Sequence, residues 1–109
     1  MGPTWELVQV APQIDIPTDR IASFCQRHQV RRLWLFGSVL GPEFGPNSDV
    51  DVLVEFEAAA RIGYLGMSAL ELELSEMLGR EVDLRTPAEI SPHFRDRVLA
   101  SAELQYARR

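Results

Sequence analysis

The chain has 109 residues, of which 46% are hydrophobic and 25% charged, and its formal net charge is −5. This length supports one small domain with a single core and leaves no room for a second substrate-binding domain. The eleven basic residues are all arginine and are scattered, so we expect no stable nucleic-acid binding, and the lack of lysine excludes P-loop and Schiff-base chemistry.

The N-terminal half is predicted to contain an arm, a helix and a strand. Residues 1–17 form an arm whose order the sequence leaves open, and residues 18–109 a single folded domain. Thr18 is a good N-cap, and apolar residues at helical spacing predict an amphipathic helix that continues to about Gln29. Residues 32–36 are short, apolar and aromatic, which is typical of a strand buried on both faces.

A second strand is predicted from Val50 to Phe56, after a turn rich in glycine and proline at 41–47. Alternate residues of a strand face opposite sides of its sheet. We therefore expect one row of side chains to face the core, and this row contains Val50, Val52, Val54 and Phe56. The opposite row contains Asp49, Asp51, Leu53 and Glu55.

The C-terminal half is predicted to contain a helix, a strand and a helix. After a loop at 58–63, apolar residues at helical spacing predict a helix that ends at Gly79. A third strand includes Val82 and Leu84, and it leaves Asp83 on the alternate side. The glutamates of the middle helix are expected on a solvated face, and these are Glu71, Glu73 and Glu76. The last helix is marked by the apolar residues Phe94, Val98, Leu99 and Ala102.

Two carboxylates lie close together on the second strand. Asp49 and Asp51 are two residues apart, so their Cα atoms would be about 7 Å apart on one face. Mg²⁺ prefers such oxygen ligands together with substrate phosphates. Upstream, Gly37 allows close backbone approach and Ser38 offers a hydroxyl and an N–H to an anion. The alternative is a solvated edge strand, although aspartate is unfavourable inside strands.

Gly37-Ser38, ten intervening residues and then Asp49-x-Asp51 resemble the signature of the minimal nucleotidyltransferase (MNT) domains of the polymerase beta superfamily. The resemblance spans about 21–99 and implies a minimal polymerase-beta-type α/β fold, with a small mixed sheet flanked by helices. It implies that Asp49, Asp51 and Asp83 are the catalytic metal ligands for two Mg²⁺ ions. It further implies that Gly37 and Ser38 bind the nucleotide, ATP.

The chain departs from this pattern directly after Ser38. Many relatives carry a basic residue there, whereas this chain continues Val39-Leu40-Gly41-Pro42. The triphosphate would then need other cations, and the candidates are Arg61, Arg80 and Arg85. Asp83 also has an alternative role, as a surface residue paired with Arg80 or Arg85.

MNT domains of this length resemble the antitoxins of HEPN/MNT toxin–antitoxin pairs. The resemblance implies a hetero-oligomer in which AMP is transferred from ATP to a tyrosine hydroxyl of a HEPN ribonuclease toxin, which silences it. Two alternatives stay open. One is a catalytically idle antitoxin that acts by binding, and the other is a small-molecule (antibiotic) adenylyltransferase, which usually needs a second domain for its acceptor.

The remaining sequence features favour a cytoplasmic protein. The single cysteine, Cys25, excludes an intrachain disulfide. We expect no membrane association, because the sequence contains no charged leader followed by an apolar core and no apolar stretch of the ~20 residues that a bilayer requires.

Overall fold

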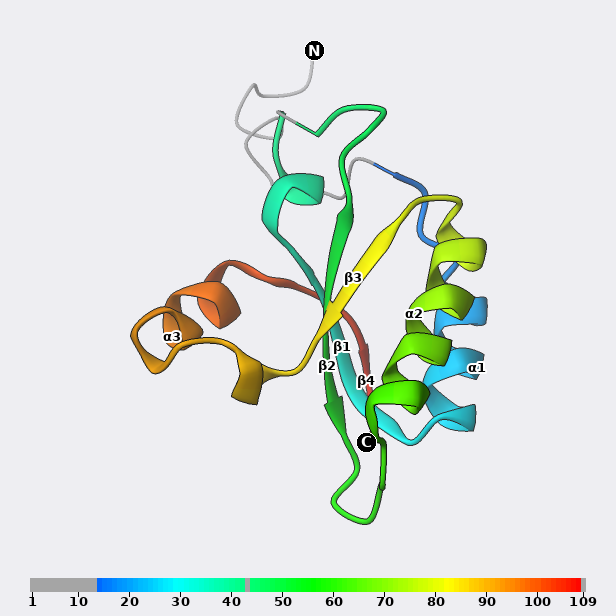
Figure 1. Ribbon diagram of the computed structural model, residues 1–109. Helices are drawn as coiled ribbons and strands as arrows, with labels where there is room; N and C mark the ends of the chain where they lie inside the picture. Colours follow the sequence, from blue (N-terminus) through cyan, green and yellow to red (C-terminus); the bar gives the residue numbers. More distant parts are fainter. Residues whose placement is uncertain (1–13, 43, 109) are drawn as a thin grey trace.

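A four-stranded mixed sheet with strand order β3-β2-β1-β4 forms the centre of the protein (Figure 1). The computed structural model describes residues 14–42 and 44–108. In chain order the elements, with η for a 3-10 helix, are α1 (Thr18–Arg27), β1 (Val30–Phe36), η2 (Gly37–Leu40), β2 (Val50–Phe56), α2 (Tyr64–Leu78), β3 (Val82–Arg85), η3 (Pro87–Glu89), α3 (Pro92–Ser101) and β4 (Glu103–Ala107). The predicted α/β class, with a small mixed sheet flanked by helices, is confirmed.

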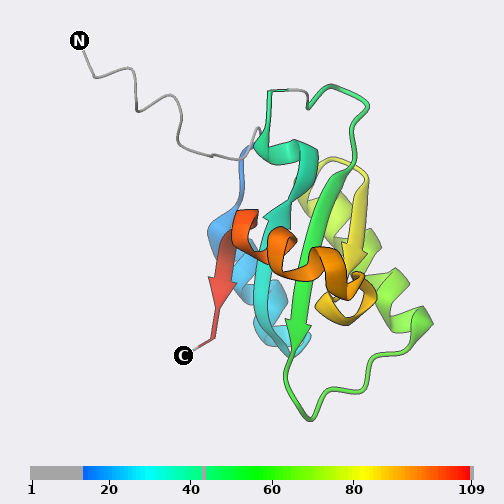
Figure 2. The ribbon, with the colours of Figure 1, turned by 90° about the vertical axis from the view of Figure 1, so that its left-hand side faces the viewer.

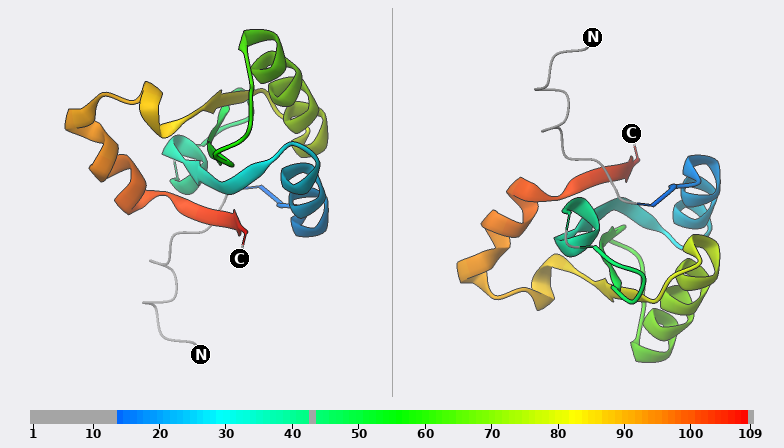
Figure 3. Two further views of the ribbon diagram at one scale, coloured as in Figure 1. Left: turned by 90° about the horizontal axis from the view of Figure 1, so that it is seen from below. Right: turned by 90° about the horizontal axis from the view of Figure 1, so that it is seen from above.

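Helices cover both faces of this sheet. Strand β1 is antiparallel to β2 and β4, and β2 is parallel to β3. Helices α1 and α2 lie side by side on one face, and α3 crosses the other (Figures 2 and 3). Every residue of α3 is at least partly exposed, so this helix lies more loosely on the sheet than the other two.

The main core lies between the sheet and the α1–α2 layer. Val50, Val52 and Val54 are fully buried there, together with residues of both helices such as Phe24 and Leu74. Burial of each such side chain contributes about 1.5–3 kcal/mol. The predicted assignment of β2 faces is therefore confirmed. Leu53 is also fully buried but is not part of this core cluster, in agreement with its place on the opposite face.

One strand was not predicted. The last helix ends at Ser101 rather than continuing through Ala102, and residues 103–107 form β4 at the edge of the sheet. Strand β4 pairs with β1, with Leu104 opposite Trp34. Leu104 and Tyr106 alternate with polar residues, but the run is only five residues long and none of its residues is fully buried, so the pattern is a weak strand signal. Pairing with β1 stabilises the strand.

The start of the chain is described only from Ile14. Ile14 and Ile16 pack against the core, so the described end of the N-terminal arm contributes to the domain. Residues 1–13 of the arm lie outside the described residues. None of the helices in residues 14–42 and 44–108 is long and apolar enough to cross a membrane.

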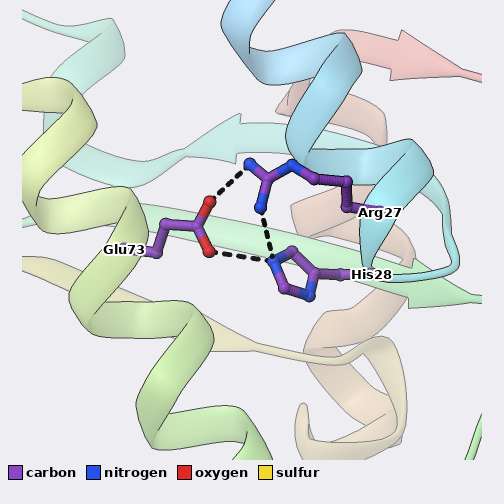
Figure 4. Close-up of polar contacts among 3 residues, drawn as sticks. All are labelled: Arg27, His28 and Glu73. Atoms are coloured by element: carbon purple, nitrogen blue, oxygen red, sulfur yellow. Dashed lines mark hydrogen bonds and ion pairs between the residues drawn. The ribbon is translucent and has the colours of Figure 1, made fainter.

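Two glutamates of α2 are not simply solvated, contrary to the prediction. The Oε2 atom of Glu73 accepts a hydrogen bond from Arg27 Nη2 at 2.5 Å, and its Oε1 atom lies 2.8 Å from His28 Nε2 (Figure 4). These contacts join α2 to the C-terminal end of α1. The prediction failed because the apolar spacing of α2 gives no information about which polar residues of α1 face it.

Glu71 has a different role, at the free edge of β3. Its Oε2 atom accepts a hydrogen bond from the backbone N–H of Leu84 at 2.9 Å, and Ser75 Oγ accepts one from Val82 N at 3.1 Å. Unpaired edge groups can otherwise pair with another chain. Helix α2 therefore satisfies the outer edge of the strand that carries Asp83.

Candidate active site

The turn after β1 brings the backbone against an aspartate of β2. Gly37 begins η2 with a φ of +75°, a conformation that favours glycine. A Cβ atom at this position would lie 2.3 Å from Asp51 Oδ2, well inside van der Waals contact. Val39, fully buried, anchors the turn. Position 37 therefore requires glycine both for its backbone conformation and for the space that the carboxylate occupies.

The sheet register places two of the predicted aspartates on adjacent strands. Asp51 of β2 pairs in parallel register with Asp83 of β3, and residues in register share a face of the sheet. Asp49 lies two residues before Asp51, at the exposed entrance to the strand. In Figure 1, η2 lies beside the start of β2. All five residues predicted for the site, Gly37, Ser38, Asp49, Asp51 and Asp83, belong to these neighbouring segments.

The electrostatics of Asp51 reflect this crowding. Burial raises the pKa of the Asp51 carboxyl above its ordinary value of 3.8, and the negative charges of Asp83 and then Asp49 raise it further. Arg85 has the opposite effect. Hard oxygen ligands that repel one another in this way suit a divalent cation, which would compensate their charge.

Asp83 forms an ion pair in the structure. Its Oδ2 atom accepts hydrogen bonds from Arg85 Nη2 at 3.2 Å and Nε at 3.3 Å. Within residues 14–42 and 44–108, no three histidine, cysteine, aspartate or glutamate side chains are arranged to hold a metal ion. An exposed pair of this kind contributes about 1 kcal/mol or less, so rotation of Asp83 toward a cation would cost little. Its role as a ligand stays a prediction.

The three arginines considered for the triphosphate lie in different places. Arg85 lies beside the aspartates. Arg61 donates to the carbonyl oxygens of Ala58, at 3.5 Å, and Ala60, at 3.1 Å, in the loop that follows β2 at the other end of the sheet. Arg80 donates to backbone carbonyls of the loop before β2. Arg85 is therefore the best placed of the three to meet a phosphate.

Comparison with known proteins agrees with this geometry. A sequence model of the nucleotidyltransferase domain family matches residues 19–104. A protein of Methanocaldococcus jannaschii, assigned by inference as a protein adenylyltransferase, is 39% identical over 83 residues, which are 76% of this chain and 87% of the relative.

Solved structures show the same fold. One, described as a minimal nucleotidyltransferase, is 35% identical, with a TM-score of 0.66 over 78% of this chain and 85% of that one. A toxin–antitoxin structure with AMP-PNP has 20% identity and a TM-score of 0.69 over 86% of this chain and 76% of that one. The Shewanella oneidensis complex of an MNT antitoxin with a tri-AMPylated HEPN toxin has 19% identity and a TM-score of 0.61, over 84% and 70%.

Proposed function

Because the chain belongs to the nucleotidyltransferase domain family, we propose that it transfers AMP from ATP to a hydroxyl group of a partner protein, with release of pyrophosphate and of the hydroxyl proton. The observation that supports this most directly is the contact between the Gly37 backbone and the Asp51 carboxylate, with Asp83 in register on the next strand. The relative assigned as a protein adenylyltransferase favours a protein acceptor, and the neighbour with AMP-PNP favours ATP as the donor.

In this proposal the two sides of the site have different tasks. The backbone and hydroxyl of Gly37 and Ser38 hold the terminal phosphates, and Asp49 and Asp51 hold Mg²⁺ at the start of β2. Asp83, once released from Arg85, would complete the ligand shell of the ion next to the attacking hydroxyl, and the guanidinium of Arg85 would then be free to approach a phosphate. When bound, Mg²⁺ would neutralise phosphate charge and favour ionisation of the acceptor hydroxyl. The protein itself contributes position and fixed charge.

The acceptor we propose is a tyrosine of a HEPN ribonuclease toxin. The similar fold of the antitoxin in complex with a tri-AMPylated HEPN toxin supports this partner. An added AMP brings negative charge and bulk, which would exclude RNA from a neighbouring cleavage site.

The test is to incubate the chain with Mg-ATP and its HEPN partner and to measure the partner's mass. We expect an increase by one or more AMP groups on tyrosine. The double variant Asp49→Asn/Asp51→Asn should reduce the rate by about 100-fold or more, because it removes the groups that position the charge-stabilising ion. An unmodified partner whose toxicity is still neutralised would contradict transfer and indicate inhibition by binding alone.

A further inference from the structure

Arg80 holds the loop that leads into the site. This residue lies between α2 and β3, and its Nη2 atom donates hydrogen bonds to the carbonyl oxygens of Gly45 and, at 3.0 Å, Ser48. Its guanidinium carbon lies 4.3 Å from the centre of the Phe44 ring. One side chain therefore contacts three residues of the five-residue segment 44–48, directly before Asp49.

The segment is also closed by its own hydrogen bonds. Ser48 Oγ accepts a hydrogen bond from Gly45 N at 2.9 Å, and Ser48 N donates one to Gly45 O at 3.1 Å. Gly45 O thus receives both a backbone N–H and the guanidinium. Residues 44–48 and Arg80 therefore form one hydrogen-bonded unit directly before Asp49. Because a guanidinium is planar and rigid, it can stack on a ring and donate to carbonyls at once, which an ammonium group cannot do.

The backbone next to Arg80 holds the other side of Asp49. Val50 N donates a hydrogen bond to Glu81 O at 2.8 Å, so Ser48 and Val50, the two neighbours of Asp49, are both bound to the segment 80–81. Two residues further on, Asp83 lies in register with Asp51. The short segment from Arg80 to Asp83 therefore fixes the position of Asp49 relative to the other two aspartates.

We propose that Arg80 is a positioning residue for Asp49 and does not itself bind the triphosphate. The inference rests on the proposed function, because Asp49 matters here as a ligand of the divalent cation. Groups that orient a metal ligand typically contribute 10- to 100-fold in metal affinity. Substitution of Arg80 should therefore weaken cation binding even when no nucleotide is present, whereas loss of a phosphate contact would weaken only nucleotide binding.

The test compares the full chain with Arg80→Lys, which keeps the charge but cannot stack and bridge the carbonyls together. The matched control is Arg61→Lys, since Arg61 also donates to loop carbonyls but at the other end of the sheet. Mn²⁺ affinity is measured by electron paramagnetic resonance with and without ATP. Amide exchange of Ser48 and Val50 is measured by NMR in the ligand-free chain, and circular dichroism verifies folding.

For Arg80→Lys we expect Mn²⁺ affinity without ATP to fall by about 10- to 100-fold and the Ser48 and Val50 amides to exchange faster. Arg61→Lys should change neither. Phe44→Leu removes the stacking alone, so it should weaken Mn²⁺ binding by about 2- to 5-fold in the same direction. This second variant keeps the test decisive if Arg80→Lys does not fold.

Two results would overturn the inference. The first is wild-type Mn²⁺ affinity without ATP in Arg80→Lys, or in Phe44→Leu if Arg80→Lys does not fold. The second is a loss of Mn²⁺ affinity in Arg80→Lys only when ATP is present, which would assign Arg80 to a phosphate contact. A wild-type chain that binds no Mn²⁺ with or without ATP would instead reject the proposed function. Failure of the positioning role and failure of the proposed chemistry are therefore distinguishable.

Discussion

Gly37 combines two constraints that usually occur separately. Its φ of +75° disfavours any residue with a side chain, and the space where a Cβ atom would lie is occupied by Asp51 Oδ2. Gly79 has the first constraint without the second, because its φ is +68° but nothing lies within 4 Å of a Cβ atom built there. The two glycines therefore separate the effect of backbone strain from the effect of contact with the site.

We predict that Gly37→Ala lowers the free energy of unfolding by about 1–3 kcal/mol and also abolishes Mg²⁺-dependent ATP binding, because the new methyl group must displace Asp51. Gly79→Ala should lower stability by about 1 kcal/mol and leave ATP binding unchanged. Urea unfolding and isothermal calorimetry measure the two properties. Equal loss of ATP binding in both variants would show that strain alone, and not contact with Asp51, decides the result.

The proximity of the candidate site residues could be predicted from the sequence, but the contacts that they make could not. Gly37, Asp49 and Asp51 belong to one local sequence motif. Asp83 comes into register with Asp51 because β3 lies parallel to β2. The ion pair of Asp83 with Arg85 is one of two pairings that the sequence allowed. The contacts of Arg80 with a loop more than thirty residues earlier have no signal in sequence spacing, because they depend on how the loop folds back.

At the scale of elements, helix α2 has two roles besides covering the core. Ser75 and Glu71 satisfy the edge amides of β3, and Glu73 joins α2 to α1. The hydrogen bond from Arg27 is the largest cause that lowers the pKa of Glu73 below its ordinary value of 4.5, and burial opposes it. Because the folded-state pKa is lowered, the ionised carboxylate stabilises the fold above pH 4.5, and this stabilisation is lost as the pH falls through the lower folded value.

We predict that Glu73→Gln lowers the free energy of unfolding by up to about 1 kcal/mol at pH 7, since the pair is partly solvated. The difference from the wild type should shrink as the pH falls below 4.5. Glu76→Gln, which changes an exposed glutamate of the same helix, should alter stability by less than about 0.5 kcal/mol. Urea unfolding over a pH series measures this, and a Glu73→Gln deficit that persists in acid would indicate lost packing instead.

The elements with strong periodicity were predicted well, and the edge strand was not. Strand β2 has the predicted bounds, and Gly79 ends α2 in the left-handed conformation, because alternation and a C-terminal glycine are local signals. Strand β1 begins at Val30, two residues before the predicted start, after Gln29 at a φ of 58°. Strand β4 needs β1 as a neighbour, and a pattern read along one segment does not contain that information.

At the scale of the whole molecule, the negative charges of the candidate site lower the stability of the fold. Asp51 is half-buried and lies near the charges of Asp49 and Asp83, so its ionised form is unfavourable in the folded chain. The chain carries a formal net charge of −5, which adds general repulsion. A cation that binds the folded chain alone removes this local cost, and its binding free energy adds to global stability.

We therefore predict that Asp51→Asn raises Tm at pH 7 without metal but removes the response to Mg-ATP. The gain should be a few degrees, since about 1 kcal/mol corresponds to roughly 4–8 °C in a domain of this size. For the wild type, Mg-ATP at 100 times its Kd should stabilise the fold by about 2.7 kcal/mol, and EDTA should reverse this.

The control is Asp15→Asn, which makes the same charge change as Asp51→Asn at an exposed position before α1. It should leave both the Tm and the response of the Tm to Mg-ATP as they are. Differential scanning calorimetry measures each Tm. A metal-free Asp51→Asn chain that melts below the wild type would mean that the Asp51 carboxylate stabilises the fold, and that Gly37 is packed against it for structure and not for ion binding.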